Sequence, residues 1–494
     1  MRKKIVPGSF DIVLGFVVLF GLFLRLYQLQ ASSLWLDEIM TSGRIQTPTR
    51  DILHDLLKTP FPPLYYVFMH YWTGFAGLSV YTLRLPSALF STLIIPAAFF
   101  FTRELYDRKT ALTAAFLLSL SPYAIFYGQD AKMYPLLWLL GILSFYFFYR
   151  MMREGRKSDV FWHCLVTTLA IYTLYIGFVF ILIQVGLFLF WSRRLHWKQY
   201  VLSLACTLIL FFPWAAIFIT QAAHRTGIQW IPNIGIGEFS LKLIREIIFG
   251  RGYHKLIQPP KPMLIAAFAG IYILIGLSNF IRLDGAGKRR RLSFEFEPNS
   301  VFVASLVAGT LLIYGLIHWA HYPILIVRYV GWIHIPLAIL AARALWRFRP
   351  PTRVILSVFV MAGLLFAVHF YYRHAIKTWE DWKEMFVVLQ KEISETPDSH
   401  LIVSSVCSPR MQPVFNRAVR VYNAGKPLEA MHEAFFLKNR KELLSQNFRK
   451  IFIVYRKKEA VPEISLQGYE AVDHSFLGQI GFLEFKKVTP HDEK

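Results

Sequence analysis

Residues 10–29 read FDIVLGFVVLFGLFLRLYQL, an apolar run long enough to cross a bilayer as a helix. The run is followed by Leu34-Trp35-Leu36-Asp37-Glu38, in which two adjacent carboxylates stand beside an aromatic side chain. The pair therefore lies where a membrane span meets water. Two interpretations are open at this point: a solvated loop, or the start of an active site.

Long apolar runs recur along the chain, which has 494 residues, 55% of them hydrophobic and 16% aromatic, and a mean hydropathy of +0.42. The runs are continuous rather than alternating, so they predict membrane helices. We expect a polytopic α-helical membrane protein of about eleven spans. They lie near residues 10–29, 84–102, 111–128, 133–150, 160–175, 177–191, 200–219, 262–281, 300–319, 329–346 and 354–372.

The net charge of +23 belongs almost entirely to the membrane part. Residues 375–494 carry 18 Lys and Arg against 16 Asp and Glu, which leaves +21 for the first 374 residues. Those charges cluster between spans, at residues 2–4, 103–109, 150–157, 193–198, 288–291 and 343–353. All six clusters fall on the cytoplasmic side if the N-terminus is inside, as the positive-inside rule requires. This distribution argues against a nucleic-acid-binding protein, and an odd number of spans puts the C-terminus outside.

Targeting and cysteine patterns add little. Arg2-Lys3-Lys4 before an apolar run resembles a signal peptide, but no convincing cleavage site follows, so we expect a retained first helix. The three cysteines have no metal-type spacing and predict no disulfide framework.

Two long segments, about 30–83 and 220–261, are predicted to lie outside. In the first, the apolar positions 52, 53, 56 and 57 share one helical face, which predicts a short helix on the membrane surface. Residues 64–78 are apolar but short for a span, so we expect a re-entrant or interfacial helix. Residues 284–298 form an inside loop.

The chain changes character near residue 375, where long apolar runs stop. We therefore divide it into a membrane domain, 1–374, and a soluble α/β domain, 375–494, outside the cytoplasm. In the latter, strands are expected at 401–406, 419–422, 450–455 and 481–485, and helices at 379–393 and 428–446.

Charged side chains near the outer ends of spans are the candidates for chemistry, because ionisable groups at membrane depth are costly. Asp37 and Asp130 both lie there, and Arg84, Lys132 and Arg328 are outward cations. Arg84 is either a stray exception to the charge pattern or a cation kept for an anion. Asp130 and Lys132 are either a solvated turn or part of a site. Three cations near aromatic residues suit a lipid phosphate.

Five motifs in order carry a resemblance to a known superfamily: Trp-x-Asp-Glu from Trp35, Pro-Pro-Leu-Tyr-Tyr from Pro62, Leu-Arg-Leu-Pro-Ser-Ala from Leu83, Ser-Pro followed by Tyr-Gly-Gln-Asp-Ala-Lys-Met-Tyr from Ser121, and Arg328-Tyr329. The set resembles the GT-C membrane glycosyltransferases. Within them it is similar to the bacterial branch related to protein O-mannosyltransferases and the lipid A aminoarabinose transferase. The likeness covers roughly residues 10–346 and is clearest in the first 140.

This resemblance implies an inverting transferase that uses a polyprenyl-phosphate-linked monosaccharide on the outer face of the bacterial inner membrane. Asp37 matches the family's essential acid, which would act as base toward an acceptor hydroxyl, and the adjacent Glu38 is the second catalytic candidate, in a supporting role. Arg84 matches the arginine that stabilises the departing phosphate. The remaining donor-binding positions implied by the resemblance are Asp130, Lys132, Tyr134, Arg328 and Tyr329.

Departures from the family pattern bear on metal binding. Phe61 stands where relatives often carry His or Lys before Pro-Pro, which weakens the case for a metal or phosphate contact there. Some relatives use a divalent metal, for which Glu38, His54 and His254 are the candidate ligands, though their spacing is not diagnostic. We place His54, Tyr65 and Tyr66 in the substrate loop and predict no certain cofactor.

The leading hypothesis is thus a glycosyltransferase acting on a glycolipid, a cell-wall glycan or a protein. A transporter or flippase for a lipid-linked saccharide is the alternative, and it predicts mid-bilayer charges and broken helices in paired repeats. A structural protein that displays the C-terminal domain is a third class, and it leaves the outward Asp, Arg and Lys set unexplained.

Overall fold

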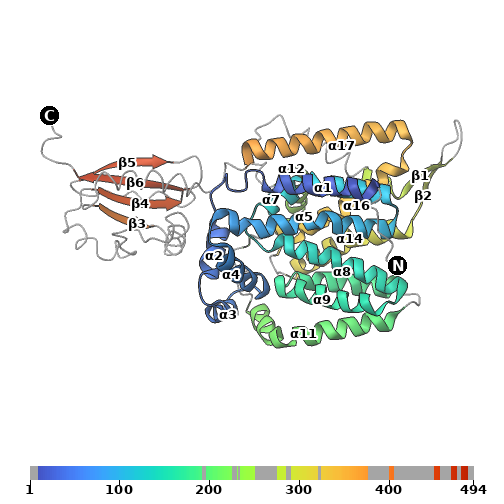
Figure 1. Ribbon diagram of the computed structural model, residues 1–494, viewed down its shortest axis with the longest axis horizontal. Coiled ribbons are helices and arrows are strands. Elements are labelled where there is room, and N and C mark those ends of the chain that lie inside the picture. The colour runs from blue at the N-terminus through green and yellow to red at the C-terminus, as the bar shows by residue number, and fades with distance from the viewer. Residues whose placement is uncertain are drawn as a thin grey trace, which may run out of the picture. The chain divides into compact units, whose positions relative to one another are not determined.

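A helical membrane part and a β-sheet part make up the protein, seen here in a computed structural model (Figure 1). The structure describes residues 9–191, 196–224, 231, 234–250, 275–284, 291–320 and 324–375, and the strands within 400–487. The chain forms two compact units. The first comprises residues 1–27, 48–71 and 84–372, and the second comprises 28–47, 72–83 and 373–494.

Helices occupy ten of the eleven predicted spans, and the other, 262–281, lies mostly outside the described residues. Six helices of the described chain are long and apolar enough to cross a membrane, or seven if a bent pair counts as one span. The full number of eleven stays a prediction. The helices are α1 (Ser9–Leu26), α2 (Leu36–Ile45), α3 (Thr49–Leu57), α4 (Leu64–Ala76), α5 (Val80–Leu105), α6 (Arg108–Ser119), α7 (Pro122–Gly128), α8 (Tyr134–Glu154), α9 (Lys157–Thr173), α10 (Gly177–Trp191), α11 (Trp197–Ala223), α12 (Ile236–Phe249), α14 (Pro298–Trp319), α15 (Val327–Val330), a 3-10 turn (Gly331–Ile333), α16 (His334–Arg347) and α17 (Pro350–Phe370).

Helices α8, α9 and α11 lie side by side in the first unit (Figure 1). A buried hydrogen-bond chain joins them to α10. His163 Nδ1 lies 2.7 Å from Ser203 Oγ, and its Nε2 lies 3.2 Å from Gln184 Oε1. Gln184 in turn donates to Ser144 Oγ at 2.8 Å. Since lipid tails are as apolar as leucine, such polar contacts help to hold membrane helices together.

The predicted span 111–128 is in fact a broken helix. Helices α6 and α7 meet at a bend of 57°. Pro122 has no backbone N–H to continue the α6 ladder, and it stands at the first turn of α7, a position that proline favours. Ser121 caps the new helix, because its Oγ accepts the N–H of Ala124 at 3.3 Å. The bend changes the direction of the chain just before Gln129.

The predicted inside loop 284–298 contains structure that the sequence did not suggest. Residues 281–284 (β1) and 291–294 (β2) pair as an antiparallel hairpin. Past the hairpin, the Glu297 carboxylate receives two hydrogen bonds of 3.0 Å from Arg343, which joins this loop to α16.

The second unit contains a four-stranded mixed sheet of order β3-β4-β6-β5, formed by His400–Ser404, Lys450–Arg456, Ile480–Lys487 and Tyr469–Ser475 respectively. Strand β3 is parallel to β4, and the other pairs are antiparallel. Three of these four strands, β3, β4 and β6, were predicted, and β5 was not. The predicted strand 419–422 and helices 379–393 and 428–446 lie outside the described residues.

Candidate active site

Asp37 and Glu38 lie in the first turn of helix α2, in the second unit. Glu38 is fully buried, and its Oε2 accepts the backbone N–H of Trp35 at 3.2 Å. That contact satisfies one of the donors that every helix N-terminus leaves open. Asp37 is half-buried. The two neighbours therefore differ: the Glu38 carboxylate caps the start of α2 through this hydrogen bond, and the Asp37 carboxylate does not take part in it.

The predicted donor-site residues of the first unit are buried. Arg84 and Asp130 are each 3% exposed, and Lys132 and Arg328 are each 7% exposed. This burial contradicts the interpretation of Asp130 and Lys132 as a solvated turn. Charged groups kept out of water are costly unless paired or kept for an ionic ligand.

Lys132 is linked to the helix that carries Arg84. The hydroxyl of Ser87, one turn after Arg84 in α5, donates to the carbonyl of Lys132 at 3.1 Å. Residues three apart lie on the same face of a helix, so Arg84 and Ser87 share the face turned to the Lys132 segment.

The late Arg-Tyr motif meets the same segment. The Arg328 guanidinium lies 5.8 Å from the ring centre of Tyr134 and 5.9 Å from that of Tyr329. The two rings are themselves 6.4 Å apart. Cation–π contacts of this range hold a guanidinium while leaving its N–H groups for hydrogen bonding. Three stretches far apart in sequence, around residues 84, 132 and 328, are therefore joined.

An aromatic wall supports this cluster from α7, α8 and α16. Tyr123 donates to the Val327 carbonyl at 3.1 Å and stacks on Trp138 with ring centres 5.4 Å apart. Trp138 also meets His334 at 4.9 Å. A side chain at Gly331 would collide with the Tyr123 hydroxyl, so glycine is required there. The wall holds the start of α15, the short helix that contains Arg328.

Comparison with known proteins gives the same fold. A family model described as dolichyl-phosphate-mannose-protein mannosyltransferase matches residues 60–217. The structure of ArnT from Cupriavidus metallidurans bound to undecaprenyl phosphate superposes with a TM-score of 0.59 at 14% identity, covering 96% of this chain and 98% of that one. The Archaeoglobus fulgidus oligosaccharyltransferase superposes with a TM-score of 0.53 at 12% identity, covering 97% of this chain and 74% of that one. The chain has the GT-C fold. No curated protein sequence matches it.

The three residues predicted for the substrate loop differ in how exposed they are. His54 is exposed on α3, whereas Tyr65 and Tyr66 of α4 are buried, with ring centres 5.6 Å apart. Helix α3 ends against the far end of α11, where Gln221 donates to the carbonyls of Leu56 and Leu57 at 2.8 and 3.2 Å.

Metal binding stays a prediction. Among the residues that the structure describes, no three His, Cys, Asp or Glu side chains form a group able to hold an ion. His254 lies outside those residues. The Trp35 N–H already occupies one carboxylate oxygen of Glu38.

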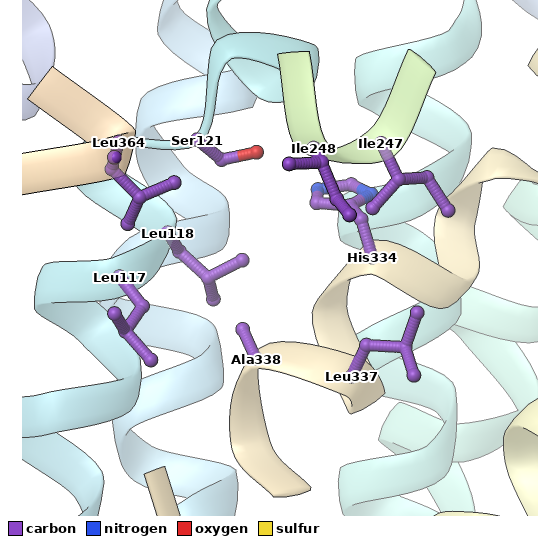
Figure 2. Close-up of a pocket in the computed structure, with 10 residues that line it drawn as sticks. Leu117, Leu118, Ser121, Ile247, Ile248, His334, Leu337, Ala338 and Leu364 are labelled. Atoms are coloured by element: carbon purple, nitrogen blue, oxygen red, sulfur yellow. The ribbon is translucent and has the colours of Figure 1, made fainter. Parts of the chain in front are cut away.

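A small cavity adjoins the break between α6 and α7. Figure 2 shows Leu117 and Leu118 on one side, Ile247, Ile248 and His334 on the other, and Ser121 at one end. Its volume of about 30 Å³ suits one water molecule and excludes a sugar.

Three buried charged residues in the described part of the GT-C domain were not among the predicted site residues, and one of them, Asp159, is paired with Arg150 at 3.5 Å. Glu246, on α12, is 4% exposed, and its helix packs against α7 and α15. Arg25, in α1, is fully buried. Its signal was present in the sequence, because it is the only Lys or Arg in the run 10–29.

Proposed function

We propose that the protein is an inverting glycosyltransferase that moves a monosaccharide from a polyprenyl phosphate to an acceptor hydroxyl. The observation that carries the proposal is the burial of Arg84, Lys132 and Arg328 on three chain segments that the Ser87 hydrogen bond and the Arg328–Tyr134 contact link. In a site of low dielectric, cations stabilise a departing phosphate more strongly than they do in water. The GT-C fold and the family match support the same class of donor.

The reaction is a single displacement. The acceptor oxygen attacks the anomeric carbon as the bond from that carbon to the phosphate oxygen breaks. The bonding electrons leave with the polyprenyl phosphate, and the acceptor proton passes to the Asp37 carboxylate. Attack opposite the leaving group inverts the anomeric configuration. Asp37 is the base, Arg84, Lys132 and Arg328 hold the phosphate, and Asp130, Tyr134 and Tyr329 line the donor site.

Membrane placement follows from the charge pattern. We propose eleven spans in the bacterial inner membrane, with residues 1–374 as the catalytic domain and 375–494 as an α/β domain outside the cytoplasm. Acceptor hydroxyls on that side belong to glycolipids, cell-wall glycans or proteins. Any divalent metal would be held near Glu38.

Product analysis tests the proposal against the flippase alternative. Purified protein is incubated with a polyprenyl-phosphate-linked sugar and candidate acceptors, and both lipid and glycan products are measured by mass spectrometry and NMR. A transferase releases free polyprenyl phosphate and forms a glycoside of inverted configuration. Transbilayer movement of the intact donor, with no release of polyprenyl phosphate, would favour the flippase.

A further inference from the structure

We propose that Arg25 is a positioning residue that holds the broken helix α6–α7 in place and so aims the loop Gln129–Lys132. The proposal rests on the function above, because the direction of this loop affects activity only if Lys132 binds the donor phosphate. Arg25 contacts neither Asp130 nor Lys132 in any hydrogen bond that the structure describes, so its action passes through α7.

The break replaces the regular hydrogen bonding at the end of α6, where the Leu118 carbonyl accepts the Ser121 N–H at 3.3 Å. In an unbroken helix the N–H of residue 122 would bond to the carbonyl of Leu118, but Pro122 has no N–H. Arg25 Nη2 donates to that carbonyl at 3.2 Å, and Nη1 donates to the carbonyl of Ser119, also at 3.2 Å. Hydrogen bonds to backbone groups matter most in a membrane interior, so the guanidinium adds to the long Ser121 contact the donor that Pro122 cannot supply.

The same side chain reaches the middle of α7. Arg25 Nε donates to Ser91 Oγ at 2.7 Å, and Ser91 Oγ donates to the carbonyl of Ala124 at 2.8 Å. A Cβ on Gly128 would lie 3.0 Å from Ser91 Cβ and 3.3 Å from Arg25 Cγ. Glycine therefore lets Arg25 and Ser91 approach the last residue of α7.

The far end of α7 is held by the backbone of Arg25. Gln129 Nε2 donates to the carbonyls of Arg25 and Tyr27 at 3.1 and 2.7 Å, and its Oε1 accepts the Tyr371 hydroxyl at 2.7 Å. One residue of α1 thus contacts the end of α6 directly, the middle of α7 through Ser91, and Gln129, just after α7, through its carbonyl. Asp130 and Lys132 follow directly.

The chemistry explains why an arginine stands there. Its guanidinium donates four hydrogen bonds within the described part of the chain, each to a neutral oxygen. The last carbonyls of α6 carry the negative end of the helix dipole, which favours a cation. Lysine has one nitrogen and cannot bridge Leu118, Ser119 and Ser91 together.

The test uses full-length protein in detergent and four variants. Arg25→Gln removes the guanidinium, and Arg25→Lys keeps the positive charge but lacks the branched guanidinium group. Ser91→Ala removes the hydroxyl that joins Arg25 Nε to the Ala124 carbonyl and leaves the guanidinium in place, so it tests the proposal even if Arg25→Gln does not fold. Arg150→Gln is the matched control: Arg150 pairs with buried Asp159 at 3.5 Å, but it lies about 24 Å along α8 from Tyr134.

Two readouts separate positioning from general destabilisation. Hydrogen–deuterium exchange is measured over residues 121–133, and undecaprenyl phosphate is the binding probe. In Arg25→Gln and Ser91→Ala, exchange in this segment should rise, and the Kd should increase by about tenfold in Arg25→Gln, the scale of one weakened charged contact. Arg25→Lys should recover only part of the loss. Arg150→Gln should lower the thermal midpoint without changing exchange at 121–133 or the Kd.

The proposal is overturned if exchange at 121–133 and the Kd are unchanged in Arg25→Gln or Ser91→Ala protein that folds. It is also overturned if Arg150→Gln changes both as much as Arg25→Gln does. If the unaltered protein does not bind undecaprenyl phosphate, the proposed function fails instead, and the exchange data still decide whether Arg25 holds α7.

Discussion

At the scale of single residues, the proposed donor site depends on side-chain charge. Arg84, Lys132 and Arg328 come from three distant stretches and are all buried. A phosphate leaving group gains from each nearby cation because little water screens the interaction. A variant that removes one charge should therefore affect the donor before it affects the acceptor.

Arg84→Ala should lower kcat/KM for the lipid donor by about 10–100-fold, the effect of losing one hydrogen-bonded charge contact. Arg84→Lys should retain more activity. Arg103→Ala, at the other end of the same helix, is the control, because Arg103 stacks on Phe100 at 5.1 Å and faces the cytoplasm in the proposed topology. Steady-state kinetics with varied donor measure the effect. Equal values for Arg84→Ala and the unaltered protein would remove Arg84 from the donor site.

Gly331→Ala should destabilise the aromatic wall. The new Cβ would collide with the Tyr123 hydroxyl, whose hydrogen bond to Val327 would be displaced. Overpacking of this kind costs about 1–3 kcal/mol. Gly315→Ala is the control, since a Cβ there meets nothing within 4 Å. Thermal unfolding in detergent should show a lower midpoint for Gly331→Ala alone, and equal midpoints would show that the wall can adjust.

Residue patterns drew attention to the buried charged residues of the proposed donor site, but not to the residues that support them. Lys132, Tyr134 and Arg328 stood out because charged and aromatic groups are rare at the outer ends of apolar runs. Arg25 was missed because a single charge does not alter the hydropathy of a twenty-residue run. Its partners are backbone carbonyls, which no sequence pattern displays.

At the scale of helices, the break between α6 and α7 matters more for the candidate site than the length of the spans does. Length and hydropathy gave the positions of the helices, since lipid requires every backbone group to be bonded within a segment. The bend itself depends on Pro122 and on the tertiary contacts of Arg25. The apolar face of α3 shows the same limit: Ile52 and Leu56 are buried, while Leu53 and Leu57 are exposed.

Asp107→Ala should weaken the start of α6. The Asp107 carboxylate accepts the N–H groups of Lys109 and Thr110 at 2.8 and 3.0 Å. Loss of such a cap costs about 1 kcal/mol. Arg108→Ala, an exposed neighbour without this contact, is the control. A lower thermal midpoint for Asp107→Ala than for Arg108→Ala is expected, and the reverse order would exclude the cap as a source of stability.

For the molecule as a whole, orientation in the membrane is the feature that the charge clusters predict. A reporter enzyme active only outside the cytoplasm should work when fused after Lys494, and not when inserted between residues 285 and 290. A reporter active only in the cytoplasm should behave in the opposite way. An active external reporter at both places would contradict the proposed topology.

Transfer by the whole protein depends, in this account, on Asp37. The most direct measurement is mass spectrometry of outer-surface lipids and glycans from cells that produce the unaltered protein, Asp37→Asn or Glu38→Gln. Asp37→Asn removes the base and should abolish the mass of the added sugar, although the protein is still inserted and still binds undecaprenyl phosphate. Glu38→Gln keeps an oxygen that can accept the Trp35 N–H and should retain the added sugar. The same sugar-modified product in equal amount from Asp37→Asn cells would contradict the proposed mechanism.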